Sequence, residues 1–581
     1  MPSYIILSIL EGIMCGLVYS AEAVTVYTIL NALGTGESFA KLTYLIIYIA
    51  LFYLITSVLD KLYWIIIHPL IAQTLHYRMH RELFLKAQSL DLSCYDNPIF
   101  YNDFIFAMDE ADSRAIKIVN GIGTLINRLV ASGTLLGLLF TIDTIIAFLI
   151  LVVSALTTFA WLYCNRLNFK QNDECKPLRR KTNYINRTFH LVDYAKEIRT
   201  SQVADLLLAD YNATQHKLIN IQKKYGKKFF IMHGFINNIL YIGLLLVTIL
   251  RMFIKLLAGE VLLGEFAAGV NTILRVRRFF FDICQHISRF PEHSLYIEKY
   301  RNFMNTIPTI TNGSISIPDE FESLELRHVC FSYADKVCQT KEILHDINIT
   351  IKRGDKIALV GYNGAGKTTI IKLILRLYDP TSGQILWNGI DIRKFNLNDY
   401  RNKIGAVFQD YKLFATSIAE NVLCSKYTED KKSDVLNALD ISNFTSKLAT
   451  FKDGIHTQLT KEFLQEGTNL SGGEAQKIAI ARVFASSHSL IIMDEPSSAL
   501  DPLSEYALNQ NILAHCHNST VIFISHRLST TQMANKIFML SNGHIIEAGD
   551  HLQLLEKGGA YATMFNIQAK KYVNNNENHS D

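Results

Sequence analysis

Long apolar segments dominate the first 305 residues of this 581-residue chain. A helix needs about 20 residues to cross a hydrocarbon core of about 30 Å. Six segments reach that length, and each is continuously apolar, whereas a transmembrane β-strand would alternate apolar and polar residues. The sequence therefore predicts six membrane-spanning helices. Their approximate spans are residues 4–33, 42–67, 118–141, 144–165, 229–250 and 265–288.

The connections between these helices differ in length and in charge. Long connectors of about 50 and 60 residues join the second helix to the third and the fourth to the fifth, and the other loops are short. Residues 78–117 and 166–228 of the long connectors hold 19 Lys and Arg residues, against three in the short loops. Because basic residues favour the cytoplasmic side, we expect cytoplasmic connectors in a multi-pass protein of a bacterial plasma membrane.

The composition agrees with a membrane protein and argues against a nucleic-acid partner. Hydrophobic residues make up 49% of the chain, charged residues 19%, and the mean hydropathy is +0.16. The net charge of +4 is too small for binding that depends on phosphate neutralisation. The expected surroundings are therefore membrane lipids, without DNA or RNA.

The second half of the chain has a different pattern. Residues 306–323 contain two prolines and several small polar residues, which is typical of a linker. From 324 to 570, short apolar strands alternate with helical segments, and residues 571–581 form a polar tail. The predicted fold class is a two-domain membrane protein, in which an all-α six-helix domain over 1–305 precedes an α/β domain with a largely parallel sheet.

A phosphate-binding loop is predicted near the start of the α/β domain. The strand pattern KIALV ends at Val360 and is followed at once by GYNGAGKTT and an apolar helix. Glycines let backbone N–H groups turn toward phosphate oxygens, while Lys367 reaches the terminal phosphates and Thr368 binds Mg²⁺. The predicted nucleotide contacts are Gly361, Asn363, Gly364, Ala365, Gly366, Lys367, Thr368 and Thr369.

A pair of carboxylates follows a second buried strand. The apolar run LIIM ends at Met493, and Asp494 and Glu495 come directly after it. We expect Asp494 to hold Mg²⁺ and Glu495 to orient or deprotonate the water that attacks the γ-phosphate. Helix capping before Pro496 is the simpler alternative for these two acids.

The motif LSGGE at 470–474, between the phosphate loop and the carboxylate pair, resembles the ATP-binding cassette (ABC) family. The resemblance implies that the P-loop domain is an ATP-binding cassette, with ATP and Mg²⁺ as its ligands. It also implies that the signature of one chain completes the nucleotide site of another. The signature residues are Ser471, Gly472, Gly473 and Glu474.

Further residues match the family's motifs in order along the chain. Tyr333 resembles the aromatic residue that stacks on adenine, and Gln409 resembles the glutamine that contacts Mg²⁺ and couples to the membrane domain. The run 498–501, ending in Asp501, resembles the D-loop, and His526 resembles the switch histidine that senses the γ-phosphate. Glu495, His526 and Gln409 are thus the expected catalytic residues, and Thr368, Gln409 and Asp494 the expected metal ligands.

The whole chain resembles an ABC exporter half-transporter. The family implies a dimer with a second copy or a similar half-transporter, and coupling helices near 96–103 and 196–201 that contact the ATPase domains. One departure lies at 464–467, Leu-Gln-Glu-Gly, where exporters usually carry Gly-Glu-x-Gly. No peptidase domain precedes the first helix, so we do not expect the chain to cleave a leader peptide itself.

The resemblance leaves the transported substrate open. A small molecule, a peptide or a lipid-like compound could each be moved out of the cytoplasm. An importer, or a nucleotide-gated channel or regulatory protein on the same scaffold, is the alternative function.

The sixth predicted helix carries charges at a depth where lipid contact is costly. Arg275, Arg278 and Asp282 share a face at i, i+3 and i+7, and the first helix offers Glu11 and Glu22 as partners. One interpretation is an internal ion-pair network that holds helices together. The other is a translocation cavity in which an unpaired arginine attracts an acidic substrate.

Overall fold

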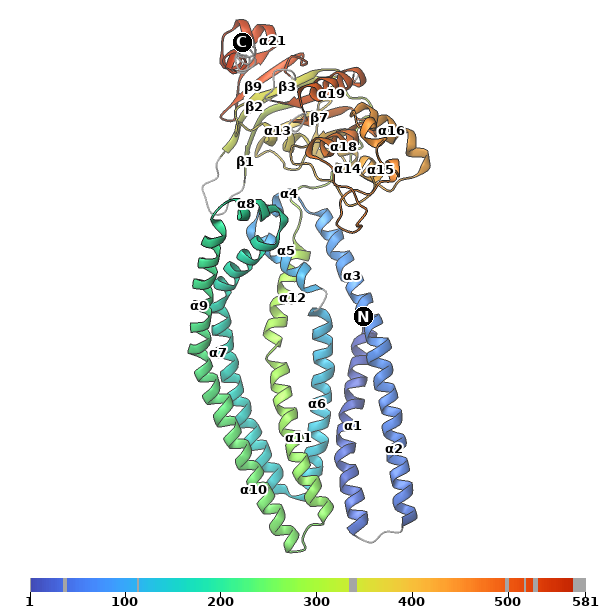
Figure 1. Ribbon diagram of the computed structural model, residues 1–581, viewed down its shortest axis with the longest axis vertical. Coiled ribbons are helices and arrows are strands. Elements are labelled where there is room, and N and C mark those ends of the chain that lie inside the picture. The colour runs from blue at the N-terminus through green and yellow to red at the C-terminus, as the bar shows by residue number, and fades with distance from the viewer. Residues whose placement is uncertain are drawn as a thin grey trace. The chain divides into compact units, whose positions relative to one another are not determined.

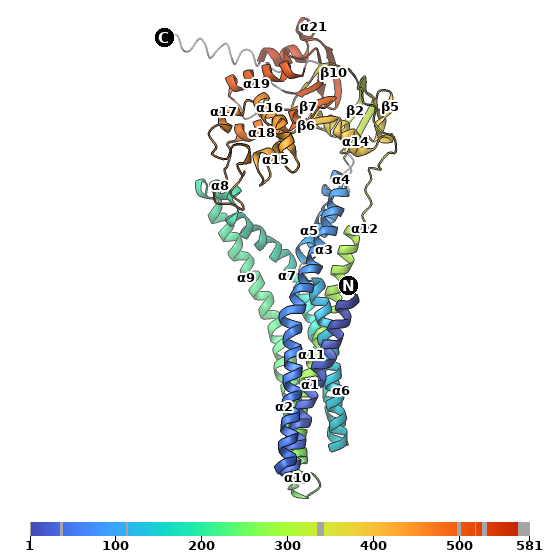
Figure 2. The ribbon, with the colours of Figure 1, turned by 90° about the vertical axis from the view of Figure 1, so that its right-hand side faces the viewer.

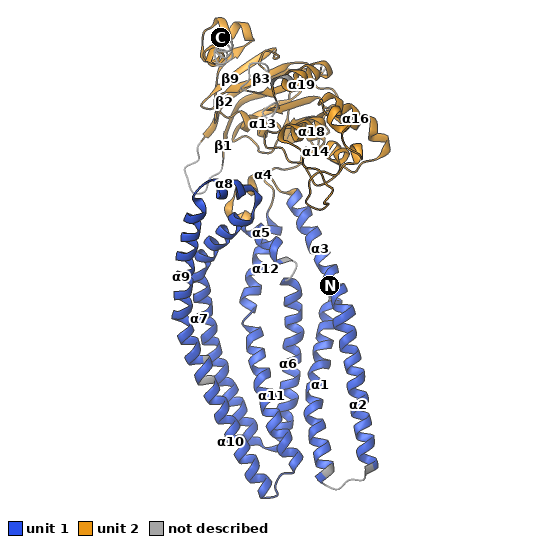
Figure 3. Ribbon diagram, in the orientation of Figure 1, with its two compact units in different colours: residues 1–88, 102–306 blue, residues 89–101, 307–581 orange. Residues whose placement is uncertain are grey.

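The computed structural model describes residues 2–34, 39–111, 114–333, 342–496, 501–516, 519–525 and 531–567. The chain divides into two compact units (Figure 3). Residues 1–88 and 102–306 form the first, here called the helical unit, and residues 89–101 and 307–581 form the second, the α/β unit.

Long helices make up the helical unit (Figure 1). Their bounds are α1 (Pro2–Gly34), α2 (Phe39–Lys61), η1 (Leu62–Ile67), α3 (His68–Ser89), α5 (Pro98–Ala111), α6 (Arg114–Ile142), α7 (Thr144–His190), η2 (Val192–Tyr194), α8 (Ala195–Thr200), α9 (Val203–Phe229), η3 (Phe230–Ile236), α10 (Asn237–Leu257), α11 (Leu263–Ile287) and α12 (Phe290–Asn305). Helices α7 and α9 run side by side for much of their length, as Figures 1 and 2 both show.

Five helical segments among the described residues are long and apolar enough to cross a membrane. They are 3–32, 40–89, 114–142, 144–190 and 238–257. The sixth predicted span corresponds to α11, which has 25 residues but includes five charged ones and is not in this set. Because α11 packs against α1 and α6, part of its charged face lies against protein.

Glycines bring α1 and α6 into close contact. Gly12 and Gly16 are four residues apart on α1, a spacing that places small residues on one face of a membrane helix. A Cβ at Gly12 would lie 2.4 Å from the carbonyl oxygen of Gly123, and one at Gly123 would lie 2.4 Å from Ser8 Oγ. Larger side chains at Gly12 and Gly123 would therefore push the two helices apart.

The described residues of the α/β unit form two sheets. A six-stranded sheet has the order β10-β9-β3-β8-β7-β6, in which only β10 is antiparallel to its neighbour, and a four-stranded antiparallel sheet has the order β2-β1-β4-β5. The strands are β1 (Ser323–Ser332), β2 (Glu342–Lys352), β3 (Lys356–Gly361), β4 (Ser382–Trp387), β5 (Ile390–Asp391), β6 (Ile404–Val407), β7 (Leu490–Asp494), β8 (Thr520–Ile524), β9 (Lys536–Ser541) and β10 (His544–Gly549).

Helices of the α/β unit cover the sheets and form a separate cluster. They are α4 (Leu92–Tyr95), α13 (Lys367–Ile374), η4 (Ile392–Lys394), α14 (Leu397–Asn402), α15 (Ile418–Leu423), η5 (Glu429–Lys431), α16 (Lys432–Ile441), α17 (Thr445–Leu448), η6 (Gly454–His456), α18 (Gly472–Phe484), α19 (Pro502–His515) and α21 (His551–Glu556). Helices α15, α16, α17 and α18 share their own apolar core, and Figure 2 shows them gathered away from β2 and β5.

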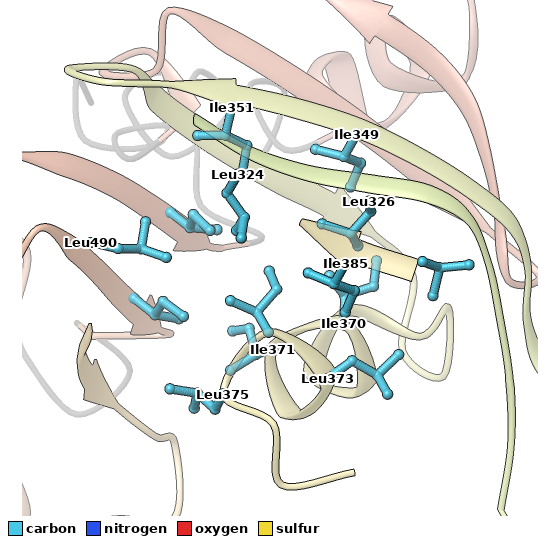
Figure 4. Packing of buried hydrophobic residues seen from close by; sticks show 14 of the residues in the cluster. Leu324, Leu326, Ile349, Ile351, Ile370, Ile371, Leu373, Leu375, Ile385 and Leu490 are labelled. Carbon is cyan, nitrogen blue, oxygen red and sulfur yellow. The ribbon is translucent and has the colours of Figure 1, made fainter. Parts of the chain in front are cut away.

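The main core of this unit lies around α13 (Figure 4). Leu324 and Leu326 of β1 and Ile370 and Ile371 of α13 are among its fully buried side chains. Leu490 of the parallel sheet belongs to the same cluster, so α13 joins the two sheets. This packing fixes the first turn of α13 at the carboxyl end of β3, the edge at which parallel α/β sheets bind ligands.

The short segment 89–101 packs with the α/β unit although it precedes it by more than 200 residues. The Asp91 carboxylate accepts hydrogen bonds from the backbone N–H groups of Thr309 and Ile310, and the Tyr378 hydroxyl donates to Asp96. The first coupling helix was expected near 96–103. The structure has the single turn α4 and then α5, which covers residues 98–103 and continues to Ala111. Pro98 occupies the first position of α5, where its missing N–H costs nothing.

Candidate functional site

The predicted phosphate loop connects β3 to α13. A Cβ at Gly361 would lie 2.3 Å from the Leu540 carbonyl oxygen, and Gly364 has φ +80°, so both positions require glycine. Lys367 Nζ donates to the carbonyl oxygens of Gly361 and Tyr362 at 2.8 and 3.1 Å. The Lys367 side chain therefore folds back toward the loop that precedes α13, and its ammonium contacts the backbone of that loop.

The first turn of α13 offers a positive field to an anion. Its leading N–H groups have no partner earlier in the helix, and Lys367 adds a charge beside them. Burial lowers the pKa of Lys367, although the carboxylates of Glu495 and Asp494 oppose the shift. The other predicted contacts divide by exposure. Asn363, Gly364 and Thr368 are exposed, whereas Gly361, Ala365, Gly366 and Thr369 are buried.

Asp494 and Glu495 leave the sheet at the end of β7, beside this loop. Thr368 Oγ1 donates to Asp494 Oδ2 at 3.4 Å, which joins the first turn of α13 to the neighbouring strand end. Gln409 Nε2 donates to Glu495 Oε2 at 3.0 Å. The structure therefore brings together the three predicted metal ligands and the predicted base.

The oxygen donors at this edge fit Mg²⁺ by their chemistry. Thr368 supplies a hydroxyl, Asp494 a carboxylate and Gln409 an amide carbonyl, and hard divalent cations prefer such oxygens. Asp494 is only 4% exposed. Burial, with the adjacent Glu495 carboxylate, raises the pKa of Asp494 to about 6, and a bound cation would relieve this unfavourable burial of charge.

Glu495 has an unusual backbone conformation. Its φ is +49°, in the left-handed region that few non-glycine residues adopt, and such values cluster at functional sites. Its N–H donates to the Ile524 carbonyl at 3.0 Å, and its own carbonyl accepts from Gln476 Nε2 at 3.1 Å. These two bonds hold the turn in place. Gln476 was not among the predicted site residues, and only its place just after the signature motif pointed to it.

The signature motif forms the beginning of α18. Ser471 caps the helix by accepting from the Glu474 N–H, and the Glu474 carboxylate accepts from the Ser471 N–H in return. Glu474 also pairs with Lys447 at 3.0 Å. Ser471 and Gly472 are exposed, while Gly473 and Glu474 are half-buried. The helix N-terminus therefore presents polar groups at the surface.

A contact missed by the sequence analysis links the signature to the segment after Gln409. The Tyr411 hydroxyl donates to the Gly472 carbonyl oxygen at 2.7 Å. Tyr411 follows Gln409 by two residues and is half-buried, and no feature of the sequence distinguishes it from the other tyrosines. This bond connects the segment that contains Gln409, whose side chain contacts Glu495, to the first turn of α18.

The remaining predicted residues are partly described. Tyr333 packs edge-on against Phe331 and Tyr378, and its hydroxyl lies 3.4 Å from Thr369 Oγ1, so its ring borders α13. Asp501 Oδ1 accepts from the Ser504 N–H at 3.0 Å at the start of α19. His526 and residues 498–500 lie outside the described residues.

The predicted charged face of α11 is divided among different partners in the helical unit. Arg275 pairs with Glu22 of α1, and Asp282 pairs with Arg128 of α6 at 2.9 Å. Arg128 also stacks over the rings of Tyr19 and Phe279. Arg278 is exposed. The structure thus brings one of the two predicted acidic partners, Glu22, to α11, while Glu11 accepts from Trp64 Nε1 at 3.2 Å.

Comparison with known proteins gives matches in both halves of the chain. The family model described as ABC transporter matches residues 344–498. The subtilin transport ATP-binding protein SpaT of Bacillus subtilis is 28% identical over 506 residues, which cover 86% of this chain and 80% of that protein. A putative multidrug export ATP-binding/permease protein of Staphylococcus aureus is 38% identical over 261 residues, but the match spans only 44% of its length.

A solved structure has the same fold along almost the whole chain. It is a bacterial Atm1-family ABC exporter with ATP bound, and the superposition has a TM-score of 0.73 at 20% sequence identity. It covers 97% of this chain and 98% of that one, so the likeness includes the helices as well as the α/β unit. The predicted fold class is confirmed.

Proposed function

The chain belongs to the ABC transporter superfamily, and on this premise we propose that it is an exporter half-transporter that uses ATP to move a substrate out of the cytoplasm. The observation that carries the proposal is the meeting of Lys367, Thr368, Asp494, Glu495 and Gln409 at one edge of the parallel sheet. Lys367 supplies an amine for phosphate, and Thr368, Asp494 and Gln409 supply oxygen donors for the metal. Glu495 supplies a carboxylate close to where the terminal phosphate of ATP would bind.

Each of these groups has a proposed part in ATP hydrolysis. The N–H groups of the loop 361–366 and the Lys367 ammonium bind the phosphates, and the ring of Tyr333 stacks on adenine. Thr368, Asp494 and Gln409 hold Mg²⁺, which neutralises charge on the β- and γ-phosphates. Glu495 accepts the proton of the attacking water. His526 contacts the γ-phosphate in this proposal, from a position just after β8.

The functional unit is proposed to be a dimer. The chain has one phosphate loop and one signature, and the exposed N-terminus of α18 is suited to receive the γ-phosphate of ATP bound to a second chain. Ser471 and Gly472 would bind that phosphate, with Asp501 at the contact between the chains. The phosphate loop, Glu495, the signature and His526 are all intact in the sequence, so two copies of this chain would make two complete sites, and a similar half-transporter could take the place of one copy.

The proposed division of labour follows the domains. Residues 1–305 form the membrane domain, 306–323 a linker, 324–570 the ATPase domain and 571–581 a tail. ATP binding brings two ATPase domains together, and hydrolysis releases them. The bond from Tyr378 to Asp96 supports a role for the segment 89–101 in passing this motion to the membrane helices, with the ATPase domain in the cytoplasm.

The substrate class is proposed from the relatives as a peptide, a small molecule or a lipid-like compound, because the two relatives are named for subtilin transport and multidrug export. Transport can be tested in inside-out vesicles with a panel of fluorescent peptides, cationic dyes and labelled lipids. We expect ATP-dependent accumulation of at least one probe by the wild-type chain and none by the Glu495→Gln variant. Equilibrating flux that needs no hydrolysis would indicate a channel, and ATP-driven loss from the vesicles would indicate an importer.

A further inference from the structure

The sheet edge that carries Glu495 and the signature helix α18 of the same chain are joined by hydrogen bonds along two routes. On the first route, Gln409 Nε2 donates to Glu495 Oε2 at 3.0 Å, and the Tyr411 hydroxyl donates to the Gly472 carbonyl oxygen at 2.7 Å. On the second, Gln476 Nε2 donates to the Glu495 carbonyl oxygen at 3.1 Å. Gly472 and Gln476 are four residues apart on α18, so they lie on one face of the helix. The two routes therefore close into a ring.

The two routes differ in how deeply they are buried. Gln476 is 1% exposed, and its bond to the Glu495 carbonyl lies largely inside the unit, where the loss of a partner is costly. Gly472 is exposed and Tyr411 is half-buried, so their bond lies near the surface, where water can replace either partner. The Gln476 route thus anchors α18 to the sheet, and the Tyr411 route is the one that can open and close at little cost.

The hydroxyl of Tyr411 makes this link, and the ring has a separate role. The ring packs against the apolar cluster that joins β6, β7 and α18, of which Val407, Ile480 and Met493 are members. A phenylalanine would keep this packing and lose the bond to Gly472. Burial raises the pKa of Tyr411, so the hydroxyl stays protonated and remains a donor at neutral pH. The Gly472 carbonyl can accept from it, because a carbonyl oxygen has two lone pairs and the helix uses one.

In the proposed dimer this ring lies between two different ATP sites. Glu495 and Gln409 of a chain serve the site that contains its own phosphate loop, whereas its signature serves the site of the other chain. Gln409 donates to Glu495 through Nε2, which leaves its Oε1 atom for Mg²⁺. When Gln409 is held by both, Tyr411 is restrained too, because only Asp410 separates the two residues. The state of the first site can thus reach Gly472, which belongs to the second.

We propose that the Tyr411 hydroxyl regulates ATP binding in the dimer by positioning the signature of its chain according to the state of Gln409 in the same chain. Tyr411 is then a positioning residue, which acts through Gly472 on the ATP site of the partner chain and contacts no nucleotide itself. This inference rests on the proposed function, because it requires an ATP site that is completed by the signature of a second chain. It predicts an effect in trans: loss of the hydroxyl weakens ATP binding at the site that uses the altered chain's signature.

Purified mixed dimers with one functional ATP site can test this. One chain carries Lys367→Ala, so the intact site combines the phosphate loop of the other chain with the signature of the Lys367→Ala chain. Tyr411→Phe is added either to the chain that supplies the signature or to the chain that supplies the phosphate loop. Tyr506→Phe, at an exposed position of α19, is added to the signature chain as the matched control. Each dimer is measured for kcat, for the KM of ATP, and for the Kd of ATP by equilibrium binding.

We expect Tyr411→Phe on the signature chain to raise the KM and Kd of ATP about fivefold, as the loss of one hydrogen bond would, and to change kcat by less than about twofold. The same substitution on the phosphate-loop chain, and Tyr506→Phe, should change each constant by less than about twofold. A merely structural role of the hydroxyl would give the same result in both placements, because each dimer contains one altered chain. The placement therefore separates positioning of the signature from a general loss of stability.

Equal effects in the two placements, or unchanged ATP affinity in both, would overturn the proposal. An effect confined to Tyr411→Phe on the phosphate-loop chain would also contradict it, because the hydroxyl would then serve the chain's own site. Failure of the proposed function would be recognised separately, since wild-type dimers would hydrolyse no ATP or Lys367→Ala on both chains would leave hydrolysis at the wild-type rate. If one-site dimers bind ATP without turnover, the comparison of Kd between the two placements decides.

Discussion

The two units hold their polar groups in different ways. In the α/β unit, Lys367 begins α13 six residues after β3 ends, Asp494 is the last residue of β7, and the sheet brings the two residues to one edge. In the helical unit, Arg275 and Asp282 meet partners on α1 and α6 that are more than 150 residues away. A site built from strand ends is specified by short motifs, whereas one built between helices depends on how the helices pack.

This difference makes the α/β unit the more sensitive one to single substitutions. Glu495→Gln keeps the shape of the side chain and removes the proposed base, so we expect ATP hydrolysis to fall by about 100-fold or more while ATP binding is retained. Steady-state ATPase and nucleotide-binding measurements on one preparation would check this. Glu462→Gln, which replaces an exposed acid of the same unit, is the control, and near-normal hydrolysis by Glu495→Gln would exclude the proposed role.

The buried carboxylate of Asp494 gives the same site a dependence on pH. Its pKa is raised from 3.8 to about 6, so the folded protein retains a proton that the unfolded chain has lost. Stability from this group is present at low pH, decreases as pH rises from about 4 to 6, and stays low above that range. Mg²⁺ must displace the proton below about pH 6, so the apparent affinity for Mg²⁺ with ATP should fall by up to about tenfold per pH unit there.

The variant Asp494→Asn separates these two effects. Without metal it should be more stable than the wild-type chain at pH 7, by at most about 3 kcal/mol, because a buried charge is gone. It should gain less stability from Mg²⁺ with ATP than the wild-type chain does, because one metal ligand is lost while the phosphate loop still binds nucleotide. Thermal unfolding at pH 5 and 7 would check both, and a destabilised Asp494→Asn variant at pH 7 would contradict the assigned burial cost.

In the helical unit the expected effects are smaller and divide between two arginines. Arg275→Gln leaves Glu22 without its cation and should lower the free energy of unfolding by about 1–3 kcal/mol. Arg278 is exposed, so Arg278→Gln should lower it by less than about 0.5 kcal/mol. Thermal unfolding in detergent measures both. Basal and substrate-stimulated ATPase in the same samples adds a second readout: lost stimulation with normal stability in Arg278→Gln would favour a substrate contact.

A small and local effect is expected at the segment 89–101. Tyr378→Phe removes the hydroxyl that donates to Asp96, which should lower the free energy of local opening by about 1 kcal/mol. The rate of amide hydrogen exchange in this segment should therefore rise about fivefold. Tyr506→Phe, at an exposed position of α19, is the comparison. Unchanged exchange in Tyr378→Phe would show that the hydrogen bond does not hold the segment.

The same difference between the two units decides which contacts could be predicted from the sequence. The edge with Lys367, Thr368 and Asp494 was predictable because a short motif links each residue to its strand: Lys367 and Thr368 follow β3 by six and seven residues, and Asp494 ends β7. The bond from Tyr411 to Gly472 was not, since nothing local indicates which of many tyrosines reaches the signature. The sequence offered both Glu11 and Glu22 to α11, and only the packing of α1 selects Glu22.

Helix packing also explains what else the sequence left open. The partner of Asp282, Arg128, lies on α6 and carries no motif that links the two. Gly12 and Gly16 have the spacing of a helix-contact motif, but the facing helix is set by tertiary structure. Such contacts depend on shape over many residues, and a single sequence does not contain that information in any short segment.

The central claim is that each ATP site is made from the phosphate loop of one chain and the signature of another. The most direct test uses purified mixed dimers, isolated through two different affinity tags, that carry Lys367→Ala and Ser471→Arg. When these changes are on separate chains, one site is intact and the ATPase should reach about half the wild-type value. When a doubly substituted chain is paired with a wild-type chain, both sites are damaged and activity should be near zero. The reverse order of activities would show that each chain completes its own site and would contradict the account.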